Sequence, residues 1–378
     1  MRIDQLPAKA RTLRILHFIS NSCDHPYLNR LVENTDLDAF EVFVGSLETR
    51  GALHDHFESV GIQTFSLNAD RRVGYPKAVL FLVRWLRREK IDIIQTHLFD
   101  ASVVGLLGSF LARTPVRVMT GHHSHEVQFY KGKPTFWLDV AASRFLSTAI
   151  IAPSLNMKEL FVDIEGVAAN KITVIRHGFS SMEFERKATS SAFEEFGFSN
   201  RIKLIAVGKL FWIKGYEGLL RAFREALNVE PKLSLVIVGS GDTALLEELL
   251  DEMDLREAVR FAGWRSDVDE LLSTADIFVH NSLAESFGMV VIEAMQSGKP
   301  IICTNVGIAK ELIKDKINGF LVNTNSVPEL ANAILRMTEL RSEWRAIGER
   351  NQRLASEFTA TEMARNHARL YDELLAKI

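Results

Sequence analysis

Cysteine and long apolar runs are scarce in this sequence of 378 residues. The two cysteines, Cys23 and Cys303, fall in different halves of the chain, so they form neither a metal-ligand pair nor a disulfide framework and give no reason to expect an oxidising compartment. The longest apolar stretch, 101–112, contains two glycines and two serines and is shorter than the roughly 20 residues that cross a bilayer. Residues 1–12 lack the apolar core of a secretion signal. We therefore expect a cytoplasmic protein without a membrane span.

The chain also lacks a strong excess of either charge. Its formal net charge is −3, with 23 Lys and Arg against 20 Asp and Glu in residues 1–189, and 22 against 28 in the remainder. A nucleic-acid-binding protein usually carries a dense basic surface, so this composition argues against a nucleic-acid partner. The mild positive excess would still allow the first half to face an anionic surface.

Short apolar runs alternate with longer stretches of helical spacing, in two series separated by the polar interval 183–200. The expected strands are 13–19, 41–46, 63–67, 91–96, 116–120, 149–153 and 171–175 in the first series, and 202–207, 233–238, 259–262, 276–280, 300–304 and 319–322 in the second. Continuous hydrophobicity within the runs is typical of parallel strands covered by helices on both faces. We predict an α/β protein with two Rossmann-like, doubly wound parallel-sheet domains, 1–189 and 190–357, facing across a cleft. The sequence leaves open whether the last helix, about 358–378, crosses back to the first domain.

Ligands of such sheets bind beyond the carboxyl ends of the strands, and the segment 280–300 is the most informative one there. It reads as a strand, a turn that holds Glu285, a helix, and a glycine stop before the next strand. The amides of Phe287, Gly288 and Met289 would open the helix, where unpaired N–H groups and a partial positive charge favour a phosphate. Glu293, two helical turns on, could accept hydrogen bonds from the two hydroxyls of a ribose.

The two glutamates, eight positions apart, resemble the E-x7-E signature of glycosyltransferase family 4. Three further segments of the second half resemble runs of that family in the same order: 207–215 (VGKLFWIKG), 235–241 (LVIVGSG) and 259–264 (VRFAGW). Looser similarity extends to 92–97, 118–122 and 171–178 in the first half.

The resemblance implies the GT-B fold, with an acceptor-binding first domain and a donor-binding second domain. It implies a retaining, front-face transfer of a sugar from a nucleoside diphosphate sugar, with UDP or GDP as the nucleotide, to a hydroxyl of a glycan, lipid-linked or small-molecule acceptor. Such reactions serve cell-surface polysaccharide or glycoconjugate synthesis.

The resemblance also implies roles for individual residues. Lys209 and Lys214 would neutralise the donor diphosphate, Glu285 would hold sugar hydroxyls, and His122 would lie beside the transferred sugar. The expected nucleotide contacts are Gly208, Gly239, Ser286, Phe287, Gly288, Met289 and Glu293. Fixed cations and helix-start amides stabilise a leaving diphosphate, so we expect no metal ion and no other cofactor.

The sequence departs from the family pattern at three places. Lys209 replaces the usual arginine, which makes the diphosphate contact less demanding in geometry. The loop 20–25 lacks the usual paired glycines, so its contact with diphosphate or acceptor stays open, and His177 replaces a usual asparagine.

Several alternatives remain. His123, next to His122, is the second candidate for the donor-facing histidine. The run 239–244 fits a dinucleotide-binding fingerprint, but the acidic residue expected after the next strand is missing. The basic helix 77–90 could rest on the inner face of an anionic membrane or simply pack its apolar side on the core. A nucleotide-sugar 2-epimerase or a non-catalytic nucleotide-sugar-binding protein would share the fold.

Overall fold

The computed structural model describes residues 11–122, 133–180 and 193–378. The chain divides into two compact units. The first comprises the residues up to Pro153, Met157–Gly178 and Ala360–Ile378, and the second comprises Ser154–Asn156 and Phe179–Thr359. The chain therefore enters and leaves the second unit near residues 178 and 359, whereas the boundaries predicted from the sequence are 189 and 357. The first change lies at Phe179 because this residue is buried in the core of the second unit and its amide donates to the Phe358 carbonyl at 2.9 Å.

The first unit is built on a seven-stranded parallel sheet of order β3-β2-β1-β4-β5-β6-β7. Its strands are β1 Leu13–Ile19, β2 Phe40–Ser46, β3 Gln63–Ser66, β4 Ile93–His97, β5 Val116–Thr120, β6 Ala149–Ala152 and β7 Ile172–Val174. Its helices are α1 Pro26–Glu33, α2 Ala52–Ser59, α3 Tyr75–Arg88, α4 Phe99–Ala112, α6 Lys133–Ala141, α7 Leu155–Asp163 and α15 Ala360–Leu375. The predicted strands are found here with ends that differ by at most two residues.

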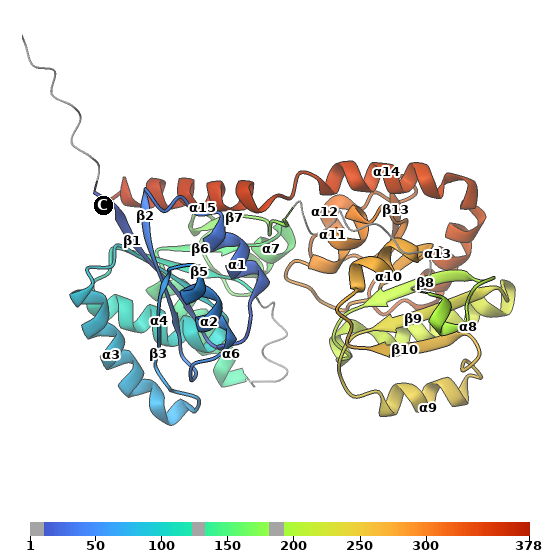
Figure 1. Cartoon of the computed structure of the whole chain (residues 1–378), viewed down its shortest axis with the longest axis horizontal. Coiled ribbons are helices and arrows are strands. Elements are labelled where there is room, and N and C mark those ends of the chain that lie inside the picture. Colours follow the sequence, from blue (N-terminus) through green and yellow to red (C-terminus); the bar gives the residue numbers. More distant parts are fainter. Residues whose placement is uncertain (1–10, 123–132, 181–192) are drawn as a thin grey trace, which may run out of the picture. The chain divides into compact units, whose positions relative to one another are not determined.

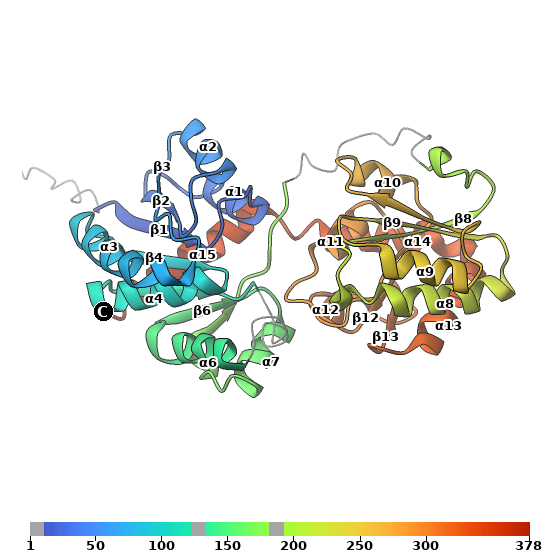
Figure 2. The same ribbon diagram turned by 90° about the horizontal axis from the view of Figure 1, so that it is seen from below.

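Helices cover both faces of this sheet. Successive residues of a strand point to opposite faces, so neighbouring residues of β1 pack against different helices. Ile15 of β1 packs in a cluster with α1, α2 and α15, whereas the adjacent Leu16 packs in a cluster with α3 and α4. Helices α3, α4 and α6 follow one another on the second of these faces (Figure 2). The continuous apolar runs of the sequence reflect this burial on both sides.

The second unit contains a six-stranded parallel sheet of order β10-β9-β8-β11-β12-β13. Its strands are β8 Ile202–Val207, β9 Leu233–Val238, β10 Val259–Gly263, β11 Ile277–His280, β12 Ile301–Thr304 and β13 Gly319–Val322. Its helices are α8 Tyr216–Val229, α9 Ala244–Glu252, α10 Val268–Thr274, α11 Met289–Gln296, α12 Ala309–Leu312, α13 Val327–Glu339 and α14 Trp344–Ala355. Leu204 of β8 packs with α8 and α13, and its neighbour Ile205 packs with α10 and α11.

The last helix, α15, returns the chain to the first unit, where it packs against α1 (Figure 1). Met363, Leu370 and Tyr371 of α15 join the core formed by β1, β2 and α1. Within the described ranges, no helix combines the length and apolar character that crossing a membrane would need.

Candidate functional site

The predicted donor-site residues of the second unit lie at the carboxyl edge of its sheet. Lys209 and Lys214 belong to the loop between β8 and α8, and Glu285 belongs to the loop between β11 and α11. Because β8 and β11 are neighbouring strands, these two loops lie side by side. The structure brings Lys214 and Glu285 into an ion pair between Nζ and Oε1, whereas Lys209 is exposed.

Glu285 is held by three donors. Besides Lys214, the Nε2 atom of His280 lies 3.0 Å from Oε1, and the Ser282 hydroxyl donates to the same oxygen at 2.9 Å. Burial alone would raise the pKa of Glu285, but the hydrogen bond from His280 and the charge of Lys214 outweigh it and lower the pKa to about 2. The side chain is therefore a carboxylate at neutral pH and can only accept hydrogen bonds.

The loop that carries the two lysines is shaped by close backbone contacts. The Leu210 amide donates to the Ser240 carbonyl at 2.8 Å, which joins this loop to the one after β9. A Cβ atom on Gly239 would lie 1.9 Å from the Gly208 carbonyl oxygen, so the two predicted glycines permit this approach. Gly215, at φ +65°, ends the loop and would place a Cβ atom 2.2 Å from the Asn281 carbonyl oxygen.

Helix α11 begins next to this cluster. Its N-cap is Gly288, at φ +93°, and its first residue is Met289. The first amides of any helix have no acceptor within the helix, and Ser286 and Phe287 lead into this position. Glu293 lies in the second turn and is partly exposed. The start of α11 therefore has the polarity expected for a phosphate site.

His122 belongs to the first unit, where it follows β5 and Gly121. Its Nε2 atom lies 3.1 Å from Nδ1 of His97, at the end of the neighbouring strand β4. The ring of Tyr27 packs edge-on against His122, with ring centroids 5.0 Å apart. His177, which replaces the family's asparagine, is buried 4.5 Å from Tyr27 by the same measure. His123 lies outside the described residues.

His280 and Ser282 could not be predicted from the sequence as partners of Glu285. The available signal was weak: His280 ends a predicted strand and Ser282 follows it, both within five positions of Glu285, but nothing in the sequence shows which way the turn folds back. The contact of His97 with His122 could not be predicted either, because it depends on the order of strands in the sheet.

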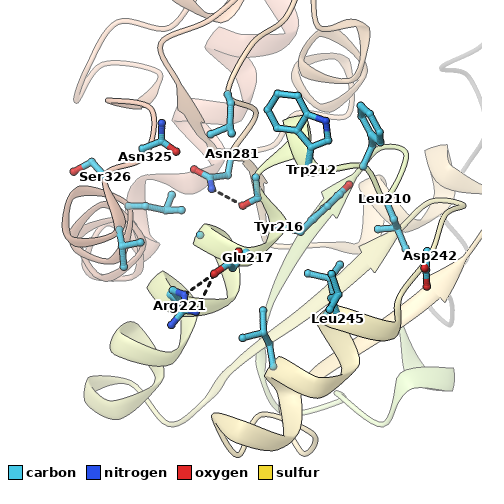
Figure 3. Close-up of a pocket in the computed structure, with 18 residues that line it drawn as sticks. Leu210, Trp212, Tyr216, Glu217, Arg221, Asp242, Leu245, Asn281, Asn325 and Ser326 are labelled. Atoms are coloured by element: carbon cyan, nitrogen blue, oxygen red, sulfur yellow. Dashed lines mark hydrogen bonds and ion pairs between the residues drawn. The ribbon is translucent and has the colours of Figure 1, made fainter. Parts of the chain in front are cut away.

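A pocket of about 540 Å³ opens in the second unit beside α8 (Figure 3). Its walls come from the loop before α8, the first turns of α8 and α9, and the start of α13. Trp212 and Tyr216 supply aromatic rings, and Asn281 donates to the Gly215 carbonyl at 2.8 Å. None of the residues predicted to contact the donor lines this pocket, so it is a separate feature of the same unit.

Within residues 11–122, 133–180 and 193–378, no group of three or more His, Cys, Asp or Glu side chains is placed to hold a metal ion. The positive charge next to Glu285 is that of Lys214.

Two family models match the chain. That of the glycosyl transferases group 1 matches residues 189–354, and that of glycosyltransferase family 4 matches residues 27–181. An Escherichia coli protein named UDP-Gal:alpha-D-GlcNAc-diphosphoundecaprenol alpha-1,3-galactosyltransferase is 28% identical over 280 residues, which are 70% of each chain. An uncharacterized glycosyltransferase of Methanocaldococcus jannaschii, MJ1607, is 30% identical over 274 residues, which are 68% of this chain and 67% of that protein.

Solved structures show the same fold at lower identity. The crystal structure of Anabaena Alr3699/HepE in complex with UDP matches with a TM-score of 0.82 and 24% identity, over 97% of this chain and 100% of that one. The crystal structure of WaaG, a glycosyltransferase involved in lipopolysaccharide biosynthesis, matches with a TM-score of 0.72 and 16% identity, over 95% and 99% of the two chains.

Proposed function

Since the chain belongs to the glycosyltransferases of group 1 and family 4, its activity is sugar transfer, and we propose that it moves a sugar from a UDP-sugar to a hydroxyl acceptor with retention of configuration and without a metal ion. The GT-B fold predicted from the sequence is confirmed by the two parallel-sheet units and by the solved structures that share it. The Lys214–Glu285 ion pair beside the start of α11 is the observation that carries the proposal.

The charge that must be stabilised is the one on the departing diphosphate. In the proposed reaction, Lys214 and Lys209 neutralise it, and the helix-start amides around Gly288 add donors that are already in place before the bond breaks. Cationic side chains and amides then supply the charge stabilisation that a metal ion gives in other transferases. Glu293 accepts hydrogen bonds from the ribose of the same nucleotide.

Glu285 is suited to hold sugar hydroxyls rather than to attack the sugar. Its bonds from Lys214, His280 and Ser282 all end on Oε1, and in the proposed reaction Oε2 accepts from the sugar hydroxyls. A carboxylate so strongly stabilised by three donors is a weak nucleophile. This supports a front-face mechanism, in which the acceptor attacks from the side that the diphosphate leaves and the diphosphate takes the acceptor proton.

UDP is favoured over GDP as the donor nucleotide because the relatives with named donors use or bind it. The Escherichia coli relative is named for UDP-Gal, and the Anabaena protein was crystallised with UDP and with UDP-glucose. A thermal-shift panel of UDP, GDP, ADP and dTDP tests this choice, because a nucleotide that binds only the folded state raises its melting temperature. A shift with GDP and none with UDP would contradict it.

Transfer must also be separated from the two rival activities. Incubation of the protein with a UDP-sugar alone should leave the sugar unchanged, whereas a 2-epimerase would isomerise it without an acceptor. Glycan and polyprenyl-linked acceptors should each be offered with the UDP-sugar. Firm UDP binding with no turnover of any acceptor would favour the non-catalytic binding protein.

We also propose that the acceptor is lipid-linked, and we infer that the first unit rests on an anionic membrane through helices α3, α4 and α6. Arg84, Arg87 and Arg88 are exposed on α3. Large apolar side chains are exposed on the same three helices: Leu80 56%, Phe81 47%, Leu107 38%, Phe110 49%, Leu111 46%, Trp137 61% and Leu138 56%. Arginine among exposed aromatic and aliphatic side chains is the composition of a surface that binds the interface of an anionic bilayer.

Vesicle sedimentation tests this surface. The wild-type protein should sediment with phosphatidylglycerol vesicles, less with phosphatidylcholine vesicles, and the double variant Leu80→Ser/Phe81→Ser should lose most of this binding. Leu245→Ser is the matched control, because Leu245 is 75% exposed but lies on α9 of the second unit. Equal sedimentation of both variants would contradict the assignment of the surface.

A further inference from the structure

Three histidines form a line of hydrogen-bonded rings in the first unit. They come from three neighbouring strands: His17 from β1, His97 from the end of β4, and His122 from the loop after β5. Nδ1 of His17 lies 3.2 Å from Nε2 of His97, and Nδ1 of His97 lies 3.1 Å from Nε2 of His122. The strand order β1-β4-β5 creates this line, since it places residues far apart in the sequence next to one another.

The two inner rings are buried and uncharged. His17 is 1% exposed and His97 is fully buried. Burial lowers the pKa of His17 to about 3 and the pKa of His97 well below its ordinary value, so neither ring carries a charge at neutral pH. A neutral imidazole has one nitrogen that donates and one that accepts.

This requirement couples the three rings. If His97 donates through Nδ1, its Nε2 must accept from His17, and His122 accepts at Nε2 and carries its own proton on Nδ1. If His97 instead accepts at Nδ1, it donates to His17 through Nε2, and a neutral His122 has an acceptor at Nδ1. The tautomers of His17 and His122 are therefore linked through His97, although these two rings do not bond to each other in this line.

We propose that His17 and His97 are positioning residues that fix the tautomer of His122 and so set whether its Nδ1 atom donates or accepts a hydrogen bond. The catalytic relevance of this arrangement rests on the proposed function, in which His122 lies beside the transferred sugar. The ring of Tyr27 packs against both His97 and His122, with centroids 5.9 and 5.0 Å away, and holds the line in place. Tyr27 itself is fixed by a 3.0 Å hydrogen bond to His367 of α15.

A matched pair of substitutions at His17 separates the hydrogen bond from the volume of the side chain. Asparagine keeps a polar atom near the position of Nδ1, whereas leucine has the same branching and no such atom. His17→Leu should convert His122 from one tautomer to a mixture and lower kcat roughly tenfold, the effect of one weakened transition-state hydrogen bond. His17→Asn should retain a single tautomer and most of the activity.

The tautomer is measured by nitrogen-15 NMR of the histidine rings in the ligand-free protein at neutral pH. His54→Leu is the control, because His54 is an equally buried histidine of the same unit whose partners are Ser46, Gly51 and Phe65. It should lose stability without changing His122. An unchanged His122 spectrum in His17→Leu, or the same change in His54→Leu, would overturn the proposal.

This measurement does not depend on turnover, so its failure can be told from a failure of the proposed function. If the spectra change as expected but the wild-type protein transfers no sugar, the hydrogen-bonded line stands and the proposed reaction fails.

Discussion

Replacement of Lys214 by methionine should destabilise the second unit by about 2 kcal/mol, because it leaves the Glu285 carboxylate without its cation. The side chains of Lys214 and Glu285 are 24% and 12% exposed. Lowering the pKa of Glu285 from its ordinary value of 4.5 to about 2 corresponds to about 3 kcal/mol of net interaction in favour of the carboxylate. His280 and Ser282 remain in the variant, so only part of this free energy should be lost.

A double-mutant cycle gives the contribution of the pair itself. Glu285→Gln removes the charge that Lys214 neutralises, so Lys214→Met should cost less in the Glu285→Gln background than in the wild type, by roughly 1–2 kcal/mol. Lys209→Met is the matched control, since Lys209 stands in the same loop and no ion pair of it is found in the described part of the chain. Its free energy of unfolding should stay within about 0.5 kcal/mol of the wild-type value.

The pH dependence supplies an independent readout. Because the pKa of Glu285 is lower in the folded than in the unfolded protein, its contribution is complete above about pH 4.5 and is lost as the pH falls toward 2. Urea denaturation at several pH values, with calorimetry to separate the two units, measures both quantities. If Lys214→Met had wild-type stability and the same acid dependence, the account of Glu285 as a carboxylate stabilised by Lys214 would be wrong.

Three further changes have definite expected outcomes. Glu293→Ala should mainly raise the KM for the donor, whereas Lys214→Ala should lower kcat, and steady-state kinetics that match the wild type in both would defeat the site assignment. Gly215→Ala should lower the free energy of unfolding by at least roughly 2 kcal/mol, because the residue is at φ +65° and the new Cβ would lie 2.2 Å from the Asn281 carbonyl oxygen. Denaturation of this variant at the wild-type urea concentration would contradict the prediction. Burial and the charge of Asp139 raise the pKa of Glu165 to about 8. The contribution of the protonated Glu165 to stability is therefore present below pH 4.5 and is lost as the pH rises through 8. Glu165→Gln should be more stable than the wild type at pH 9, and the absence of this gain would contradict the assignment of Glu165 as a buried acid.

The strands and the donor-site glutamates could be predicted because their signals are local. A continuous apolar run followed by a turn and a helix marks β11, Glu285 and α11 without knowledge of the rest of the chain. The partners of these residues could not be predicted in the same way. His280 reaches Glu285 because the turn folds back on the end of its strand, and His17 meets His97 because β4 inserts next to β1 in the sheet. The pocket beside Trp212 has the same origin, since three separate helices form its walls.

The position of α15 has a consequence for the order in which the protein can mature during synthesis. The final helix supplies Met363, Leu370 and Tyr371 to the core of the first unit, and Tyr371 donates a hydrogen bond to Gln95 of β4. A ribosome that has translated the whole of the second unit has still not produced this helix, so the earliest part of the chain to emerge is the last to complete its core. A truncated nascent chain should accordingly present a finished second unit joined to an unfinished first one, which is where a chaperone would be expected to bind.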